Sequence, residues 1–243
     1  MSQPTIATDA PTDRLQWVPL ESSPKAMSHL IRRLGVDGSV GFCDVLSFEE
    51  ELLTMVAQPV YALVFIFPLT DEYEEGRRRE AASSSNIVSP KVWFMRQTIG
   101  NACGTMAIFH AVANNQQSLP IGGEMAAFFV RTKDMSPEER AAELEKDGAV
   151  AKAHEESAAE GQTSAPQPGE EVKHHYAAFV CVDSHLYELD GRLPAPINHG
   201  PSADLLKDGT RVIQQRIKSF EGELAFSAIS LGPASDDDDN DSY

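Results

Sequence analysis

The feature of this chain that most restricts its fold is an unbroken apolar run, "PVYALVFIFPL", at residues 59–69. The run is rich in β-branched and aromatic residues and is flanked by prolines, which is typical of a short strand. Apolar and polar residues do not alternate along it, so it fits a strand that is buried on both faces. We therefore expect an α/β fold in which helices surround the sheet.

Further segments supply the other elements of this fold. Strands are expected at 175–182 and 185–191, joined by Asp183-Ser184, and at 224–231, where "LAFSAISL" alternates. Helices are expected within 17–36 (Ser-capped and ended by Gly35), within 41–56 after a short strand (Ser47 as N-cap, Glu50 at the capping-box position), within 71–86, at 136–148 (begun by Ser136 and Pro137) and within 202–220. Together, these strands and helices predict one α/β (α+β) domain over residues 15–232, with a mainly antiparallel sheet and no internal repeat.

The composition excludes some classes of partner. The chain has 243 residues and a formal net charge of −17, and its C-terminal "SDDDDNDSY" is acidic. Such a surface repels nucleic acid and anionic membranes, and no run of about 18 apolar residues is present to span a bilayer. The charge would attract a basic partner, or it serves solubility alone, and composition leaves both alternatives open.

The cysteines indicate the redox environment. Cys43, Cys103 and Cys181 are odd in number and widely separated, which argues against a disulfide framework and favours a reducing compartment. No Cys/His cluster has zinc spacing, so we expect no metal or other cofactor. The polar, acidic N-terminus lacks the features of a secretory signal. We expect a cytoplasmic protein, with an additional nuclear location left open, whose residues 1–14 and 233–243 are disordered.

Cys103 lies in "RQTIGNACGTMAIFHAV" at residues 96–112. With Asn101 as N-cap, the run from Ala102 to Ala113 predicts a helix that has Cys103 in its first turn. Backbone N–H groups and the helix dipole there stabilise a thiolate. The small residues Ala102 and Gly104 leave room for a substrate chain beside the sulfur. The alternative is a small buried cysteine with no chemical role.

A thiolate nucleophile needs a base and a group that orients the base, and the hairpin at 174–192 offers both. With a two-residue loop at 183–184, Ala177 faces Asp190, so His175 and Asp190 lie on one face as diagonal neighbours. His174 points to the opposite face under the same register. Strand parity therefore selects His175 over His174, although a lone histidine is more often a solvated or core residue.

Gln97, six residues before the cysteine, is a candidate for the oxyanion site. Acyl transfer builds negative charge on the carbonyl oxygen, and preorganised donors lower that barrier. The side-chain amide of Gln97 and the backbone N–H of Cys103 would form such a site. Taken alone, Gln97 would be interpreted as a surface residue.

Two blocks of the chain resemble the ubiquitin carboxyl-terminal hydrolase family. They are "VWFMRQTIGNACGTMAIFHAVANN" and "HYAAFVCVDSHLYELDGRLPAPINHG", and within them "NACGT", "LYELDGR" and "PINHG" are specific signatures. The likeness extends from about Trp17 to Leu231 and implies a papain-like cysteine hydrolase fold. By position in the motifs, it implies that Cys103 is the nucleophile, His175 the general base and acid, Asp190 the orienting group and Gln97 the oxyanion donor.

The resemblance implies ubiquitin as the substrate, with a closely related ubiquitin-like modifier left open, and hydrolysis of small adducts and short peptides by a monomer. The basic tail of ubiquitin ends in Gly-Gly, which suits an acidic protein with small residues beside the sulfur. By similarity, three segments should contact ubiquitin: Pro19, Leu20, Glu21, Ser22, Ser23 and Pro24; Ala158, Ala159, Glu160, Gly161, Gln162 and Thr163; and Glu223, Leu224, Ala225, Phe226, Ser227 and Ala228.

Residues 148–172 lack apolar periodicity and are rich in Gly, Ser, Pro, Ala and Glu. They predict a long loop, which in a compact domain is usually functional or disordered. The resemblance implies that this is the family's crossover loop, which passes over the active site. We expect a mobile segment above Cys103 that restricts the leaving group to small or unfolded chains.

Two other functions compete with a ubiquitin hydrolase. One is a catalytically silent protein that only binds ubiquitin, which would have no need of Cys103, His175, Asp190 and Gln97 together. The other is a general papain-like peptidase, which would favour an open cleft rather than a covered one.

Overall fold

The computed structural model describes residues 15–161, 174–220 and 225–235. Within these residues, six strands form one sheet in the order β1-β6-β2-β3-β4-β5, and every neighbouring pair is antiparallel. The strands are β1 (Val40–Asp44), β2 (Ala62–Pro68), β3 (His174–Val182), β4 (His185–Leu189), β5 (Ile197–Pro201) and β6 (Ser227–Pro233). The expected mixed fold with an antiparallel sheet is confirmed.

The apolar run at 59–69 forms the central strand β2, which pairs with β3 on one side and β6 on the other. Every residue from Ala62 to Phe67 is at most 2% exposed. Val64 and Ile66 belong to the larger apolar cluster, whereas Phe65 and its alternate neighbours belong to the cluster on the opposite face. The prediction of a strand buried on both faces is therefore confirmed.

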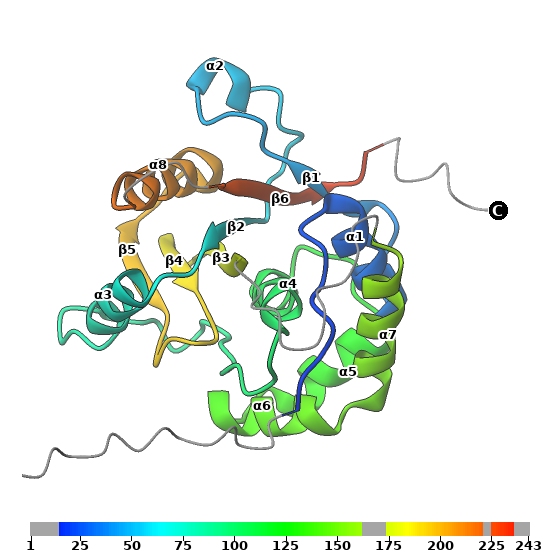
Figure 1. Ribbon diagram of the computed structural model, residues 1–243. Helices are drawn as coiled ribbons and strands as arrows, with labels where there is room; N and C mark the ends of the chain where they lie inside the picture. The colour runs from blue at the N-terminus through cyan, green and yellow to red at the C-terminus, as the bar shows by residue number, and fades with distance from the viewer. Residues whose placement is uncertain (1–14, 162–173, 221–224, 236–243) are drawn as a thin grey trace, which may run out of the picture.

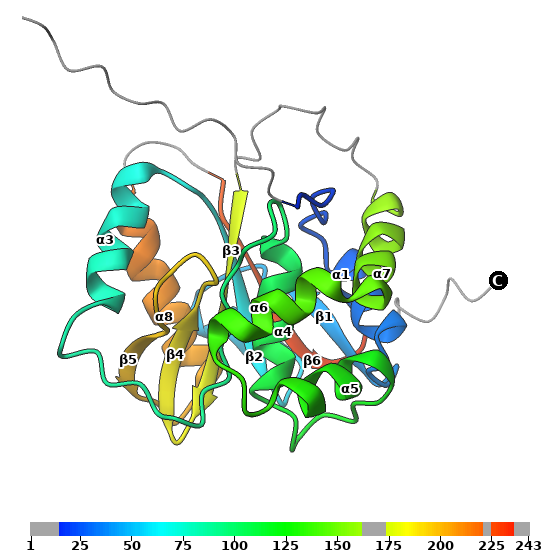
Figure 2. The same cartoon turned by 90° about the horizontal axis from the view of Figure 1, so that it is seen from below.

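Helices cover both faces of the sheet (Figures 1 and 2). They are α1 (Pro24–Arg33), α2 (Glu50–Leu53), α3 (Asp71–Ala81), α4 (Cys103–Ala113), α5 (Gly123–Thr132), α6 (Pro137–Lys146), α7 (Gly148–Ala159) and α8 (Leu205–Lys218). α4 packs directly on β2 and β3, with α1, α5, α6 and α7 on the same side, while α3 and α8 lie on the other side. None of these helices is both long and apolar enough to cross a membrane.

Side-chain caps confirm the predicted starts of α1 and α6. Ser23 accepts a hydrogen bond from the Ala26 N–H at the start of α1, and Gly35 follows the helix at φ +102°, a conformation that favours glycine. Ser136 and Glu139 form a reciprocal capping box at the start of α6.

The predicted N-cap of α2 was wrong, and the elements α5 and β5 were not predicted. Ser47 is not the N-cap of α2, because its hydroxyl accepts from the Glu49 N–H in a local turn and the helix begins two residues later, as a single turn. α5 was not predicted; it starts after Gly122 with no capping side chain, so the sequence carries no start signal there. β5 was also missed, because Asn198, His199 and Gly200 interrupt any apolar alternation.

The prediction of a loop over 148–172 was wrong for its first half, because Gly148–Ala159 is the helix α7. Asp147 caps it by accepting from the N–H groups of Ala149 and Val150. The buried face consists of Val150, Ala153, His154 and Ser157. These residues are spaced as a helix requires, but most are too small or too polar to register as an apolar stripe. Residues 162–172 lie outside the described residues.

The predicted disordered ends are mostly untested. Residues 1–14 and 236–243 lie outside the described residues. Pro233, which was assigned to the acidic tail, is the last residue of β6 and pairs with Val40 of β1. The last strand therefore extends further than the alternation at 224–231 indicated.

The assignment of α7 can be tested at its cap. Asp147→Ala should lower the free energy of unfolding by about 1–2 kcal/mol, since two N–H groups lose their acceptor. It should also accelerate amide hydrogen exchange at residues 150–157. Asp147→Asn keeps the acceptor and should preserve that protection. Equal exchange rates in all three proteins would contradict the capping role of Asp147.

Candidate active site

The β3–β4 hairpin brings His175 and Asp190 together. Ala178 pairs with Leu189 and Val182 with His185, which is the predicted register. Asp183 and Ser184 both have positive φ, as a two-residue hairpin turn of matching twist requires. As a result, His175 Nε2 lies 2.8 Å from Asp190 Oδ1, whereas His174 is exposed.

Burial sets the electrostatics of this pair. His175 is 4% exposed and Asp190 is 2% exposed. Burial by itself lowers the pKa of His175, but the charge and hydrogen bond of Asp190, together with the Cys103 thiol, raise that pKa to about 9. Burial would likewise raise the pKa of Asp190, but the charges of His175 and Arg77 hold it well below its ordinary range. The arrangement therefore favours an imidazolium beside a carboxylate at neutral pH.

Cys103 is the first residue of α4 and is 7% exposed. Its thiol contributes to the raised pKa of His175. Since Nε2 of that ring is engaged with Asp190, Nδ1 is left for the sulfur. The predicted N-cap was wrong: Ala102 occupies that position, and Asn101, at φ +60°, donates instead to the Trp17 carbonyl at 3.2 Å. The first-turn position of the thiol is nevertheless confirmed.

The space at Gly104, which was expected to be open, is occupied by neighbouring side chains. A Cβ added at Gly104 would lie 3.3 Å from the Leu20 Cβ and 3.7 Å from the Tyr176 ring. The absence of a side chain at Gly104 therefore allows Leu20 to pack against α4. The proposal that Gly104 leaves space for a substrate chain is wrong for the structure as it stands.

Gln97 is tied to the turn that follows Asp190. Its backbone N–H donates to the Gly191 carbonyl at 2.8 Å, and a Cβ on Gly191 would lie 2.8 Å from the Gln97 Cβ. Its Nε2 donates to the Ile99 carbonyl at 3.0 Å, which leaves one of its two amide hydrogens for another acceptor. The oxyanion role of Gln97 stays a prediction.

Two of the three predicted contact segments meet near this site. In Pro19–Pro24, the Leu20 carbonyl accepts from the Tyr176 hydroxyl at 3.0 Å, and Ser22 also contacts that hydroxyl. In the second segment, Glu160 contacts His29 at 2.7 Å and pairs with Arg33. A Cβ on Gly161 would lie 3.1 Å from Glu21, so the first two segments are neighbours.

The third segment predicted to contact ubiquitin also contributes Phe226 and Ala228 to the apolar core. Phe226 lies in the cluster with Phe65 and Phe220, at ring-centroid distances of 6.0 and 5.1 Å, and Ala228 is buried in β6. Ala225 and Ser227 are exposed. Gln162, Thr163, Glu223 and Leu224 lie outside the described residues. Ubiquitin contact at these segments stays a prediction.

Comparison with known proteins identifies the family. The family described as "Ubiquitin carboxyl-terminal hydrolase, family 1" matches residues 17–218. The human protein "Ubiquitin carboxyl-terminal hydrolase isozyme L1" is 44% identical over 222 residues, which cover 89% of this chain and 98% of the human protein. This chain belongs to the ubiquitin carboxyl-terminal hydrolase family.

Other members of the ubiquitin carboxyl-terminal hydrolase family agree in sequence and fold. A "Probable ubiquitin carboxyl-terminal hydrolase" of Dictyostelium discoideum is 42% identical over 88% of this chain and 87% of its own. The crystal structure of the Trichinella spiralis UCH37 catalytic domain bound to ubiquitin vinyl methyl ester matches with a TM-score of 0.74. It is 22% identical and covers 90% of this chain and 96% of that one, so it supports the fold alone.

Sequence reasoning missed two buried partners of this site, Arg77 and Glu188. Glu188 lies on the same strand face as Asp190, and a carboxylate inside the apolar strand "HLYEL" indicates that a buried cation must lie nearby. Arg77 lies in the "RRRE" run of α3, for which only a helix within 71–86 was predicted. No three His, Cys, Asp or Glu residues are grouped as metal ligands within the described ranges.

The reactivity of Cys103 tests the selection of His175 over His174. A thiol without a cation beside it is only a few per cent ionised at pH 7, so His175→Asn should slow alkylation of Cys103 by iodoacetamide at least about ten-fold. His174→Asn should leave that rate within about two-fold of wild type, because His174 is exposed. The rates are measured by mass spectrometry of the Cys103 peptide. A larger effect from His174→Asn would contradict the parity argument.

Proposed function

We propose that this protein is a thiol-dependent ubiquitin C-terminal hydrolase that releases small adducts and short peptides from the C-terminal glycine of ubiquitin. The observation that carries the proposal is the buried His175–Asp190 pair, at 2.8 Å, beside a cysteine that begins a helix. Membership of the ubiquitin carboxyl-terminal hydrolase family supplies the substrate class.

The first half of the reaction forms a thioester. The Cys103 thiolate attacks the carbonyl carbon of the terminal glycine, and the resulting oxyanion is held by the Cys103 N–H and the remaining Gln97 amide hydrogen. His175, held by Asp190, gives its Nδ1 proton to the leaving amine as the carbon–nitrogen bond breaks. The imidazolium is therefore both the counter-ion of the thiolate and the general acid.

The second half consumes the thioester. Neutral His175 takes a proton from a water molecule, and the hydroxide attacks the thioester carbonyl. The carbon–sulfur bond then breaks, ubiquitin leaves with a free carboxylate, and Cys103 and His175 return to the thiolate–imidazolium pair. Asp190 accepts a hydrogen bond throughout and keeps the ring oriented.

Binding of ubiquitin is proposed at Pro19–Pro24, Ala158–Thr163 and Glu223–Ala228. The proximity of Glu21 and Gly161 supports a continuous surface formed by the first two segments, and the net charge of −17 suits the basic ubiquitin tail. We also propose a monomer in the cytoplasm or nucleus. The three free cysteines support a reducing compartment, and the helices that cover both sheet faces support a self-contained domain.

The nucleophile can be tested by separating turnover from binding. Cys103→Ala should abolish hydrolysis of a fluorogenic ubiquitin C-terminal amide but keep the affinity for ubiquitin within about three-fold, because affinity comes from a wide surface. Wild type should form a covalent adduct at Cys103 with ubiquitin vinyl methyl ester. A silent binding protein would bind without an adduct, and a general peptidase would show no saturable affinity for ubiquitin.

The pH dependence follows from the ionisation of His175. Since its pKa is raised to about 9, the imidazolium is present below that pH and lost above it. We expect kcat/KM for the ubiquitin amide to fall as pH rises through about 9. Asp190→Asn removes the charge that raises this pKa and should move the alkaline decline to lower pH. An alkaline limb that does not move in Asp190→Asn would contradict this assignment.

A further inference from the structure

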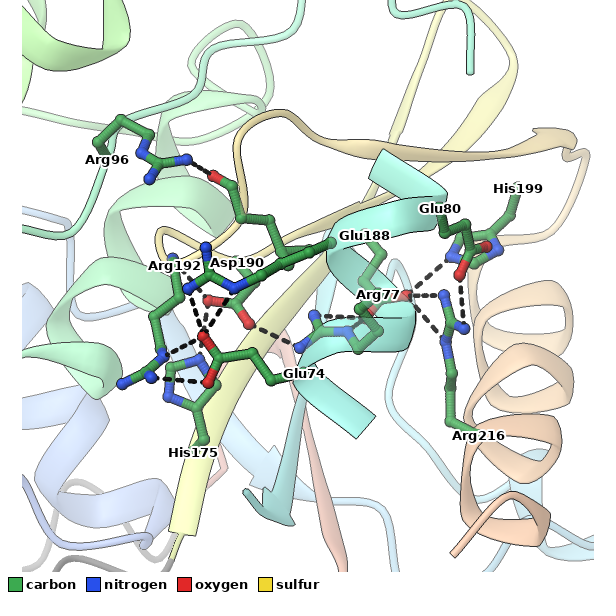
Figure 3. A network of polar contacts seen from close by, with 12 residues as sticks. Glu74, Arg77, Glu80, Arg96, His175, Glu188, Asp190, Arg192, His199 and Arg216 are labelled. Atoms are coloured by element: carbon green, nitrogen blue, oxygen red, sulfur yellow. Dashed lines mark hydrogen bonds and ion pairs between the residues drawn. The ribbon is translucent and has the colours of Figure 1, made fainter. Parts of the chain in front are cut away.

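A network of buried charges lies behind Asp190, on the side away from His175 (Figure 3). Its centre is Arg77 of α3, which is 1% exposed and lies between Asp190 and Glu188. Figure 3 shows Arg77 reaching from α3 toward the end of β4, where both carboxylates project. A fully buried arginine between two carboxylates needs a reason, because removing such a charge from water is costly.

The two oxygens of Asp190 have different partners. Oδ1 accepts from His175 at 2.8 Å and from the Arg192 N–H at 2.9 Å. Oδ2 accepts from Arg77 Nη1 at 2.7 Å, its only partner among the described residues. Because the terminal torsion of an aspartate is soft and nearly two-fold, a cation at Oδ2 is what keeps Oδ1 directed at the imidazole.

Arg77 is itself held in place from three sides. Its Nε donates to Glu188 Oε1 at 2.8 Å, and its guanidinium lies 5.1 Å from the Phe67 ring centre and 5.4 Å from that of Tyr73. The Phe67 ring also meets the His175 ring edge-on, at 5.5 Å between centroids. The same aromatic ring therefore packs against both Arg77 and His175.

Glu188 does not depend on Arg77 alone for charge compensation. Its Oε2 accepts from Arg216 Nη2 at 2.7 Å and lies 2.9 Å from His199 Nε2. Loss of Arg77 would leave Glu188 with these two partners, whereas Asp190 would lose the one partner that Oδ2 has among the described residues. The consequence of removing Arg77 therefore falls mainly on Asp190.

We propose that Arg77 is a positioning residue for the proposed hydrolase reaction: it fixes the Asp190 carboxylate so that His175 presents its Nδ1 to Cys103. The inference rests on the proposed function for its kinetic readouts alone. The titratable and charged groups that face Asp190 are His175 on β3, Arg77 and Tyr73 on α3, Glu188 on β4 and His110 on α4.

The test compares Arg77→Met with a second buried arginine. Arg140 is 9% exposed and donates to the carbonyls of Phe94, Thr132 and Lys133. In the part of the chain that the structure describes, it has no carboxylate partner. Arg140→Met therefore matches the loss of a buried guanidinium but leaves Asp190 untouched. Arg77→Lys keeps the charge but loses the fork that bridges two carboxylates.

Kinetics on the ubiquitin amide give the first readout. Arg77→Met should lower kcat on the order of ten- to a hundred-fold, as loss of an orienting partner does, with KM within about two-fold. The acid limb of its pH profile should move to higher pH, since Asp190 loses a cation that lowers its pKa. Arg77→Lys should lie between wild type and Arg77→Met, and Arg140→Met should match wild type in both respects.

Proton NMR gives a readout that needs no turnover. In wild type and Arg140→Met, the His175 Nε2 proton that is bonded to Asp190 should give a downfield resonance. In Arg77→Met it should shift upfield or vanish, and in Arg77→Lys it should persist but move. If Arg77→Met does not fold, Arg77→Lys decides by the same resonance and by its acid limb.

The outcomes separate this proposal from the proposed function. Wild-type kcat, acid limb and His175 resonance in folded Arg77→Met would overturn the positioning role, and so would equal changes in Arg140→Met. If wild type fails to hydrolyse the ubiquitin amide, the proposed function fails. The His175 resonance in the same set of variants then still decides whether Arg77 positions Asp190.

Discussion

The cost of burying charge governs how this protein is built around its candidate active site. Asp190, Arg77 and Glu188 are at most 2% exposed, and His175 is 4% exposed. Each of these groups would be strongly disfavoured away from water without an opposite charge at contact distance. They therefore alternate in sign, from His175 to Asp190, Arg77, Glu188 and finally Arg216. Removing any one member of this series costs its buried neighbours one of their opposite charges.

This requirement ties together elements that are distant in sequence. β3 carries the imidazole, β4 carries Glu188, and Asp190 follows directly after β4. α3 brings the first arginine and α8 brings the second. The His175–Asp190 pair also makes the stability of the fold depend on pH. The raised pKa of His175 adds stability that is complete below its ordinary value of 6.5 and is lost as pH rises through about 9. The depressed pKa of Asp190 adds stability above its ordinary value of 3.8, and this is lost at lower pH.

Local sequence patterns predicted the parts of the fold that local physics decides. The apolar run of β2, the Ser23 and Ser136 caps and the parity that pairs His175 with Asp190 all depend on neighbours along the chain or across one turn. The helix α7 was not predicted because its buried face is made of small and polar residues, which give no apolar periodicity in the sequence. The role of Arg77 was not predicted because it contacts Asp190, which lies 113 positions away in the sequence, and no local pattern indicates such a contact.

The central claim is that buried neighbours keep His175 charged at neutral pH, beside Cys103. Titration of His175 by NMR, in protein with 13C-labelled histidine, measures this directly. We predict that His175 is an imidazolium at pH 7.5 and loses its proton near pH 9, far above an exposed histidine such as His174. A neutral His175 at pH 7.5, with a midpoint at or below its ordinary value of 6.5, would contradict the account.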